Sequence, residues 1–181
     1  MRKPRPVKLY IFDADGTLRR TTVAGQPCPN KEGEWELIPG VRERLARIEW
    51  GKGATGAHFG VASNQGGVGM GYFSYETAYA LLWEMARQAW GREPPEGAIQ
   101  MCPHAPFAGC PCRKPKPLML IRLMHRFGVR RDETLFVGDM DRDEEAARRA
   151  GVPFAWAHEF FEWDTAAGGE SPPVANQTPV L

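Results

Sequence analysis

Short apolar runs alternate with amphipathic stretches along most of this chain of 181 residues. Four apolar runs have the length and composition of buried strands: residues 9–12, 58–62, 134–137 and 153–156. Four stretches with apolar residues at helical spacing separate them: residues 41–50, 74–90, 117–127 and 143–150. Strands that alternate with helices form a parallel sheet that helices cover on both faces. The pattern therefore predicts an α/β fold, a Rossmann-like, doubly wound parallel sheet.

Two segments interrupt this alternation. Residues 19–39 form a long connection rich in Thr, Gly and Pro, and residues 94–117 contain seven prolines. Long irregular segments in a compact domain are usually functional or are held by something local. The end of the chain, residues 165–181, is rich in Gly, Ser and Pro. We expect one domain over residues 1–164, without a large cap domain, and a flexible tail over 165–181.

Charge and hydropathy exclude several partners. Lys and Arg number 23 against 22 Asp and Glu, and a formal net charge of +1 gives no general attraction to nucleic acid or to a membrane surface. No apolar run approaches the ~20 residues of a membrane span. The short basic start leads directly into the first strand, so no signal peptide is expected. These features favour a cytoplasmic protein.

Polar residues follow three of the predicted strands. Asp13 and Asp15 follow the first, Ser63 and Asn64 the second, and Asp139 the third. In a parallel sheet these ends lie at one edge, where α/β proteins bind ligands. A buried carboxylate pair is costly unless a cation or a function compensates it, although an Asx turn at the strand end is the simpler alternative. The coincidence of three such signals predicts one polar pocket.

The residue types in this pocket suit phosphoryl chemistry. Asp13, Asp15 and Asp139 offer the hard oxygen ligands that Mg²⁺ takes beside substrate phosphate oxygens. A carboxylate beside Mg²⁺ is a competent nucleophile for phosphorus. Ser63 supplies a hydroxyl, and Lys114 could neutralise a phosphate, unless it is an ordinary surface lysine. The residues thus predict a magnesium-dependent site for a phosphorylated ligand.

Four potential metal ligands gather in the proline-rich segment: Cys102, His104, Cys110 and Cys112. Three thiolates and one imidazole form a closed tetrahedral set for zinc, which is structural because it leaves no position for water. Such a site would hold the loop of about residues 100–113 in place. Incidental free thiols are the alternative. Cys28 lies outside the cluster, and no role is assigned to it.

Taken together, these motifs resemble the four motifs of the haloacid dehalogenase superfamily of phosphohydrolases. They occur in the superfamily's order: Asp13-x-Asp15-Gly16-Thr17, Ser63-Asn64-Gln65, Lys114, and Gly138-Asp139-x-x-x-Asp143. The resemblance extends over residues 9–156. It implies a phosphatase that acts through an aspartyl-phosphate intermediate.

The resemblance also implies roles for individual residues. Asp13 would be the nucleophile, and Asp15 would be the general acid and then the general base. The substrate phosphate would contact Ser63, Asn64, Arg113 and Lys114. Mg²⁺ would bind Asp13, the backbone carbonyl of Asp15, and Asp139. Asp143 would support the fourth motif, unless it serves only as a first-turn acid of its helix.

The zinc loop narrows the expected substrate. The cysteine-rich run resembles that of heptose-bisphosphate and histidinol-phosphate phosphatases, and residues 63–73 are similar to the heptose enzymes. Ser63 stands where threonine is usual there, and Met70 where a basic residue is usual. We expect a monomeric enzyme for a small sugar phosphate or bisphosphate, with histidinol phosphate as an alternative.

Two other functions remain open at this point. One is a polynucleotide 3′-phosphatase, in which Trp35 would stack on a base and Arg19, Arg20 and Arg113 would form a local basic patch. Trp35 could instead anchor its loop by packing. The other is a non-catalytic, zinc-stabilised binding module. The presence of all five motif residues argues against it: Asp13, Asp15, Ser63, Lys114 and Asp139.

Overall fold

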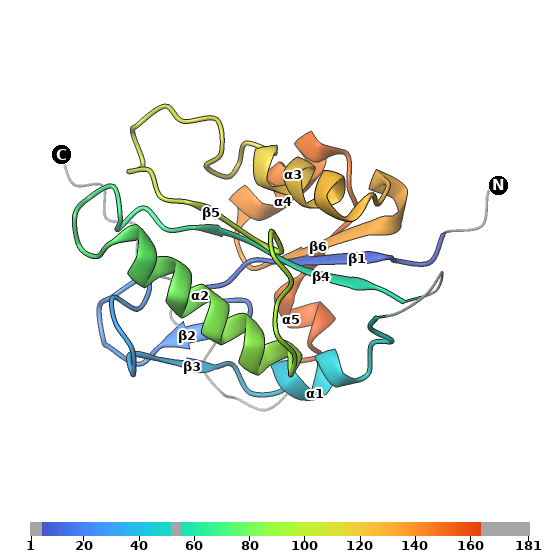
Figure 1. Ribbon diagram of the computed structural model, residues 1–181, viewed down its shortest axis with the longest axis horizontal. Coiled ribbons are helices and arrows are strands. Elements are labelled where there is room, and N and C mark those ends of the chain that lie inside the picture. Colours follow the sequence, from blue (N-terminus) through green and yellow to red (C-terminus); the bar gives the residue numbers. More distant parts are fainter. Residues whose placement is uncertain (1–4, 52–55, 164–181) are drawn as a thin grey trace.

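A five-stranded parallel sheet forms the centre of the computed structural model, which describes residues 5–51 and 56–163 (Figure 1). Its strands, in the spatial order β5-β4-β1-β6-β7, are β1 (Leu9–Phe12), β4 (His58–Asn64), β5 (Ile99–Cys102), β6 (Thr134–Gly138) and β7 (Phe154–Trp156). Every neighbouring pair is parallel. The predicted α/β sheet is confirmed, and β1 lies at its centre.

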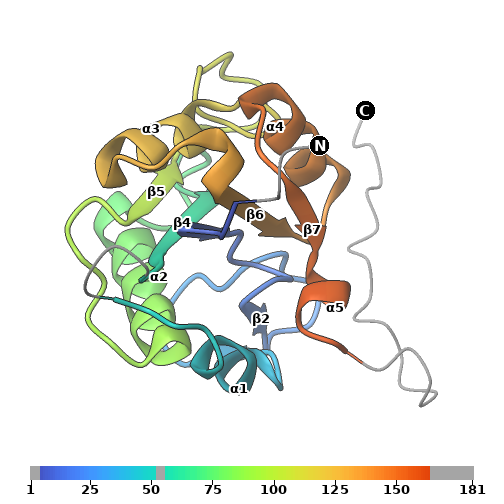
Figure 2. The same cartoon turned by 90° about the vertical axis from the view of Figure 1, so that its right-hand side faces the viewer.

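Helices cover both faces of this sheet (Figure 2). One face carries α1 (Val41–Ala46), α2 (Tyr75–Trp90) and α5 (Ala157–Phe160), and the other carries α3 (Leu118–Phe127) and α4 (Asp141–Ala150). A short 3₁₀ helix, Arg131–Glu133, precedes β6. Among the residues described, no helix is long and apolar enough to cross a membrane.

The alternation of side chains along β1 explains the two layers. Phe12 packs into the core under α1, α2 and α5, whereas Leu9 and Ile11 pack into the core under α3 and α4. All three are fully buried. Burial of side chains of this size contributes about 1.5–3 kcal/mol each. A strand buried on both faces is what a continuous apolar run predicts.

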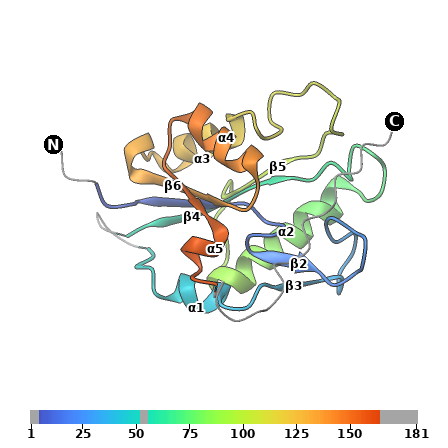
Figure 3. The same cartoon turned by 180° about the vertical axis from the view of Figure 1, so that it is seen from behind.

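The two segments that were expected to be irregular both contain strands. Residues 19–39 hold an antiparallel hairpin of β2 (Arg19–Thr21) and β3 (Trp35–Leu37), which lies beside α2 (Figure 3). The second segment includes β5, an edge strand of the main sheet. None of these three strands is a continuous apolar run, since their sequences are Arg-Arg-Thr, Trp-Glu-Leu and Ile-Gln-Met-Cys. The prediction of wholly irregular segments was therefore wrong.

Several elements differ from the prediction, among them three helices. The first helix ends at Ala46 rather than at residue 50, because Trp50 turns back and its indole N–H donates to the Leu45 carbonyl at 2.7 Å. The helix α4 begins two residues earlier than expected, and α5 was not predicted. The expected tail lies outside the described residues, so the division into residues 1–164 and 165–181 stays a prediction.

The sheet brings the three predicted polar signals to one edge. Both β4 and β6 flank β1, with Phe12 opposite Val61 and Val137. The Asp13 N–H continues the ladder by donating to the Val137 carbonyl at 2.9 Å. The residues that directly follow these positions therefore meet at the carboxyl ends of the strands, where α/β proteins bind ligands.

Candidate active site

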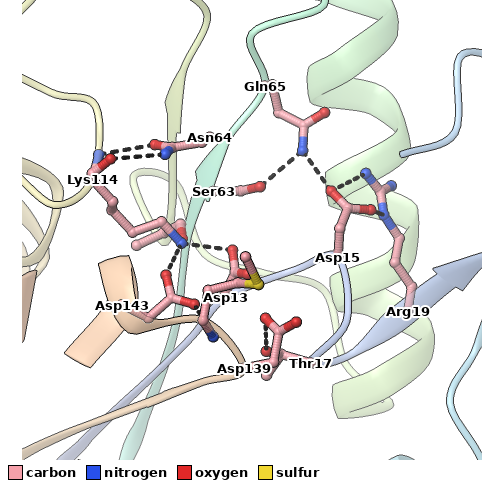
Figure 4. Close-up of polar contacts among 12 residues, drawn as sticks. Asp13, Asp15, Thr17, Arg19, Ser63, Asn64, Gln65, Lys114, Asp139 and Asp143 are labelled. Carbon is pink, nitrogen blue, oxygen red and sulfur yellow. Dashed lines mark hydrogen bonds and ion pairs between the residues drawn. The ribbon is translucent and has the colours of Figure 1, made fainter. Parts of the chain in front are cut away.

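A buried ion-pair cluster lies at this edge (Figure 4). The Lys114 Nζ is 2.7 Å from Asp13 Oδ1 and 2.7 Å from Asp143 Oδ1, and it donates to the Ala62 carbonyl at 2.8 Å. Asp13 is 5% exposed, Lys114 2% and Asp143 0%. Charges are buried to this degree only when they are paired. Lys114 is thus an integral part of the site and not a surface lysine.

The cluster carries an excess of negative charge, and the pKa values show it. Burial raises the pKa of Asp13 well above its ordinary value; Lys114 opposes this, and the neighbouring Asp143 and Asp139 carboxylates raise it further. Burial and Asp143 likewise raise the pKa of Asp139. Burial lowers the pKa of Lys114, but Asp13 and Asp143 outweigh it, and the pKa is raised overall. One ammonium does not balance three carboxylates, so the site favours an additional cation.

Three carboxylates lie close enough together to share a magnesium ion. One oxygen from each of Asp13, Asp139 and Asp143 lies within 4.8 Å of the others. Mg²⁺ has oxygen ligands at about 2.1 Å in octahedral geometry, which places neighbouring ligands about 3 Å apart and opposite ones about 4 Å apart. Thr17 Oγ1 orients Asp139 by donating to its Oδ1 at 3.2 Å. The donor set fits Mg²⁺.

The position of Asp143 is compatible with both roles that the sequence left open, support of the fourth motif and service as a first-turn acid of its helix. Its Oδ2 accepts the Met140 N–H at 3.1 Å, which caps the start of α4. Its Oδ1 faces Lys114 in the ion-pair cluster. The side chain therefore joins the end of β6 and the start of α4 to the acidic site.

The Asp15 side chain turns away from the acidic cluster. Arg19 Nε donates to its Oδ1 at 2.8 Å and Arg19 Nη2 reaches its Oδ2 at 3.4 Å, while Gln65 Nε2 donates to Oδ2 at 2.8 Å. Gln65 also donates to Ser63 Oγ at 2.8 Å. Since that hydroxyl oxygen already accepts a hydrogen bond, its proton remains available to donate to an anion.

Sequence reasoning assigned no role in the site to Arg19 or Gln65. Gln65 belongs to the Ser63-Asn64-Gln65 motif, so its position in the chain was a usable signal. Arg19 gave no such signal, because a basic residue in a polar connection ordinarily predicts a solvated side chain. Its burial depends on the hairpin that the sequence did not reveal.

Asn64 and Arg113 lie on the loop side of the site. The Asn64 side chain makes a reciprocal pair with the Lys114 backbone: its Nδ2 donates to the carbonyl at 3.2 Å and its Oδ1 accepts the N–H at 3.0 Å. Arg113 Nη1 donates to the His104 carbonyl at 3.3 Å. Asn64 therefore positions the segment that carries Lys114. A direct phosphate contact by Asn64 or Arg113 stays a prediction.

The predicted zinc ligands converge on one point. Cys102 Sγ is 3.5 Å from Cys110 Sγ and 3.6 Å from His104 Nδ1, and Cys112 Sγ is 3.3 Å from the same nitrogen. A tetrahedral zinc site with Zn–S bonds of about 2.3 Å places its sulfurs about 3.8 Å apart. Burial raises the pKa of the Cys102 thiol to about 12, so a metal is what would make it a thiolate at neutral pH. The four residues fit zinc.

The local basic patch that a nucleic-acid enzyme would need is not formed by Arg19. That side chain is fully buried on Asp15, and its neighbour Arg20 pairs with Glu36. Trp35 is half-buried against the core, with the Arg19 guanidinium 6.0 Å from its ring centre. Trp35 therefore anchors its loop by packing, which is one of the two roles that the sequence left open, and a nucleic-acid substrate stays a prediction that these contacts do not support.

Comparison with known proteins decides the family. The model for haloacid dehalogenase-like hydrolases matches residues 110–157. A D-glycero-beta-D-manno-heptose-1,7-bisphosphate 7-phosphatase of Pseudomonas aeruginosa is 40% identical over 143 residues, which cover 77% of this chain and 75% of that protein. The chain belongs to the haloacid dehalogenase-like hydrolase family. The resemblance found in the sequence is thereby confirmed.

Further relatives of this haloacid dehalogenase-like protein are also phosphatases. The enzyme of the same description from Bordetella bronchiseptica is 36% identical over 147 residues, or 80% of this chain and 77% of that protein. A crystal structure of D,D-heptose 1.7-bisphosphate phosphatase from B. bronchiseptica, complexed with magnesium and phosphate, has a TM-score of 0.64 and 32% identity over 82% of this chain and 79% of that one. These relatives are phosphatases, and this family member is a phosphatase.

Proposed function

We propose that this phosphatase hydrolyses a small sugar bisphosphate and that heptose 1,7-bisphosphate, cleaved at position 7, is its substrate. The observation that carries the chemistry is the buried Asp13–Lys114–Asp143 cluster beside Asp139. The relatives from P. aeruginosa and B. bronchiseptica, named for this reaction, support the substrate. The cysteine cluster next to Lys114 supports the same branch of the family.

The proposed reaction has two steps, and each residue has a place in it. An Asp13 oxygen attacks phosphorus while Asp15 gives its proton to the departing sugar oxygen, which leaves an aspartyl-phosphate and a free hydroxyl. Asp15 then takes a proton from water, the water oxygen attacks phosphorus, and phosphate departs from a restored Asp13. The Ser63 hydroxyl and the Lys114 ammonium donate to phosphoryl oxygens in both steps.

Two metals complete the proposal. Asp13, Asp139 and the backbone carbonyl of Asp15 would hold Mg²⁺, with Asp143 adjacent, and the ion would neutralise charge on the phosphoryl group. Cys102, His104, Cys110 and Cys112 would hold a structural zinc ion. Lys114 lies two residues after Cys112 and is bonded through its backbone to Asn64, so zinc would also fix the lysine.

We propose further that the enzyme acts as a monomer in the cytoplasm. Every residue assigned to the reaction comes from one chain, so no partner subunit is needed to complete the site. Free thiols that bind zinc suit a compartment in which cysteines are kept reduced.

A substrate panel tests this proposal. Heptose 1,7-bisphosphate, histidinol phosphate and a 3′-phosphorylated oligonucleotide would be compared by kcat/KM at several salt concentrations. We expect heptose 1,7-bisphosphate to exceed the others by at least about tenfold, which corresponds to about 1.4 kcal/mol of transition-state binding, and phosphorus NMR to show loss of the position 7 phosphate alone. A higher kcat/KM for histidinol phosphate would overturn the substrate. A higher value for the oligonucleotide, with steep salt dependence, would favour nucleic-acid ends.

A further inference from the structure

Arg19 is a fully buried arginine that the proposed reaction does not yet use. Its side chain is among the largest completely buried in the described part of the chain, at 0% exposure. Burial of a guanidinium costs several kcal/mol unless charge and hydrogen bonds compensate it. The next residue in β2, Arg20, keeps its side chain 49% exposed in a surface pair with Glu36. The burial of Arg19 therefore needs a specific interaction that compensates its cost.

The contacts of Arg19 identify Asp15 as the partner that compensates the buried charge. Asp15 is the only acidic side chain paired with Arg19 among the residues described, through Nε at 2.8 Å and Nη2 at 3.4 Å. The third nitrogen, Nη1, is buried, has no acceptor in residues 5–51 and 56–163, and points away from the carboxylate in Figure 4. The guanidinium thus leaves one donor unsatisfied and keeps two on Asp15. A merely structural arginine would gain more by reaching solvent.

The backbone holds the two residues at a fixed separation. The Gly16 N–H donates to the Arg19 carbonyl at 2.8 Å, and the Arg19 N–H donates to the Ala14 carbonyl at 3.0 Å. The turn after β1 therefore delivers Asp15 and Arg19 as one unit. On the other side, Gln65 Nε2 donates to the second carboxylate oxygen at 2.8 Å. The Asp15 carboxyl group is held between these donors on both of its oxygens, and the three hydrogen bonds use three of its roughly four lone-pair positions, which leaves one for the proton that it transfers.

We infer that Arg19 is a positioning residue, which orients the Asp15 carboxyl for proton transfer to and from the substrate oxygen. This inference rests on the proposed role of Asp15 as general acid and base. Orientation matters because a misplaced acid or base loses much of the 10²–10⁴-fold that general acid–base catalysis contributes. Lysine at this position would keep a positive charge and lose the planar pair of donors.

Substrates with different leaving groups distinguish a positioning role of Arg19 from a purely structural one. A sugar oxygen is a poor leaving group and needs the proton from Asp15. The anion of p-nitrophenol leaves readily without one. Loss of the Asp15 orientation should therefore slow the first step for an alkyl phosphate and spare it for p-nitrophenyl phosphate. General damage to the fold or to the phosphate site would slow both.

Single-turnover kinetics with enzyme in excess test the inference on the full chain. Wild type, Arg19→Met, and the matched control Arg20→Met would be compared on p-nitrophenyl phosphate and on the best alkyl phosphate of the panel. We expect Arg19→Met to slow the alkyl substrate at least about 30-fold, a part of the general-acid contribution. The p-nitrophenyl phosphate step should change less than about threefold, and Arg20→Met should match wild type on both.

A double-mutant cycle shows whether Arg19 acts through Asp15. In an Asp15→Asn background, Arg19→Met should cause little further loss on the alkyl substrate, because the two changes remove the same contribution. Equal slowing of both substrates, an undiminished effect in the Asp15→Asn background, or no effect at all would overturn the inference. If Arg19→Met does not fold, Arg19→Lys gives the same comparison with the charge retained. Failure of the proposed function itself would show differently, as an Asp15→Asn enzyme with normal turnover of the alkyl phosphate.

Discussion

At the scale of single residues, Gly16 shows how one backbone position sets the geometry of the acidic site. Its φ is +87°, in the left-handed region that favours glycine. A Cβ at this position would collide with the Asp139 carboxylate. The glycine that follows Asp15 thus serves the turn and also leaves room for a carboxylate from another strand. The sequence indicated the turn, but the contact with Asp139 follows only from the packing of the strand ends.

Substitution of Gly16 by alanine should weaken magnesium binding. Gly25→Ala is a matched control, because its φ is +79° but, apart from its chain neighbours, no described residue comes within 4 Å of the added Cβ. Both variants should lose about 1–3 kcal/mol of stability from backbone strain. Only Gly16→Ala should also need more Mg²⁺ for half-maximal activity, since it displaces Asp139. A magnesium titration of activity checks this, and an equal shift for the two variants would contradict the assigned role of Asp139.

The side chains of the site differ in how well the sequence predicted them. The positions of Asp13, Asp139 and Lys114 in the site were predicted because each residue belongs to a recognisable motif. The structure brings all three together. Arg19 was considered only as part of a basic patch in an alternative function, and it is buried. A motif fixes residue types along the chain, whereas burial of a charge is a property of the tertiary structure around it.

At the scale of elements, two loops form one unit beside the site. The Gly69 N–H donates to the Pro103 carbonyl at 2.8 Å, and a Cβ on Gly69 would collide with the backbone of Ala105. The loop after β4 is therefore packed closely on the cysteine-rich loop after β5. Asn64, at the end of β4, is bonded to the Lys114 backbone further along. A change in the cysteine cluster should thus reach the phosphate site through both contacts.

Loss of one cysteine ligand should affect zinc, stability and turnover together. We expect Cys112→Ala to lose its zinc, to melt at least about 5 °C lower, which is roughly 1–2 kcal/mol for a chain of this size, and to have a lower kcat. Cys28→Ala is the control, since Cys28 lies outside the cluster. Metal analysis, calorimetry and steady-state kinetics on the two variants check the prediction. Zinc retained in Cys112→Ala, or zinc lost with unchanged turnover, would contradict the coupling.

The elements were predictable where apolar residues form a run or a helical period. The central strands β1 and β4 are apolar runs, and the long helix α2 repeats its apolar residues at helical spacing. The hairpin of β2 and β3 has the sequences Arg-Arg-Thr and Trp-Glu-Leu and is defined by its cross-strand pairing. Strands that mix charged and apolar residues in this way carry no apolar run, so sequence patterns did not reveal them. The cysteine cluster was predictable because ligand type and spacing are local.

At the scale of the whole molecule, a nearly neutral chain contains a strongly acidic site. The formal net charge is +1, yet Asp13, Asp139 and Asp143 meet around one lysine at the end of the central strand. The order of strands explains this concentration, since β1 lies between β4 and β6. The topology was predictable from the alternation of strands and helices. The number of carboxylates that share the site was not, because it depends on how α4 begins.

Addition of Mg²⁺ should stabilise the whole protein, because the ion relieves the repulsion among these carboxylates. At a Mg²⁺ concentration of 100 times Kd, binding to the folded state contributes about 2.7 kcal/mol. For a chain of this size that corresponds to a rise of about 5–10 °C in Tm. Asp139→Asn should lose most of the rise, whereas Asp132→Asn, at an exposed acid paired with Arg130, should keep it. Calorimetry with and without Mg²⁺ checks this, and an undiminished rise in Asp139→Asn would argue against the site.

The most direct test of the aspartyl-phosphate mechanism is to detect the phosphoryl group on the enzyme. Turnover of heptose 1,7-bisphosphate, or of the best substrate in the panel, would be stopped with acid within the first turnover, and the peptides would be mapped by mass spectrometry. We expect one phosphoryl group on Asp13 in the wild type and none in Asp13→Asn, which should fold normally and not turn over. A phosphoryl group on another residue, or normal turnover by Asp13→Asn, would contradict the assignment of Asp13 as the nucleophile.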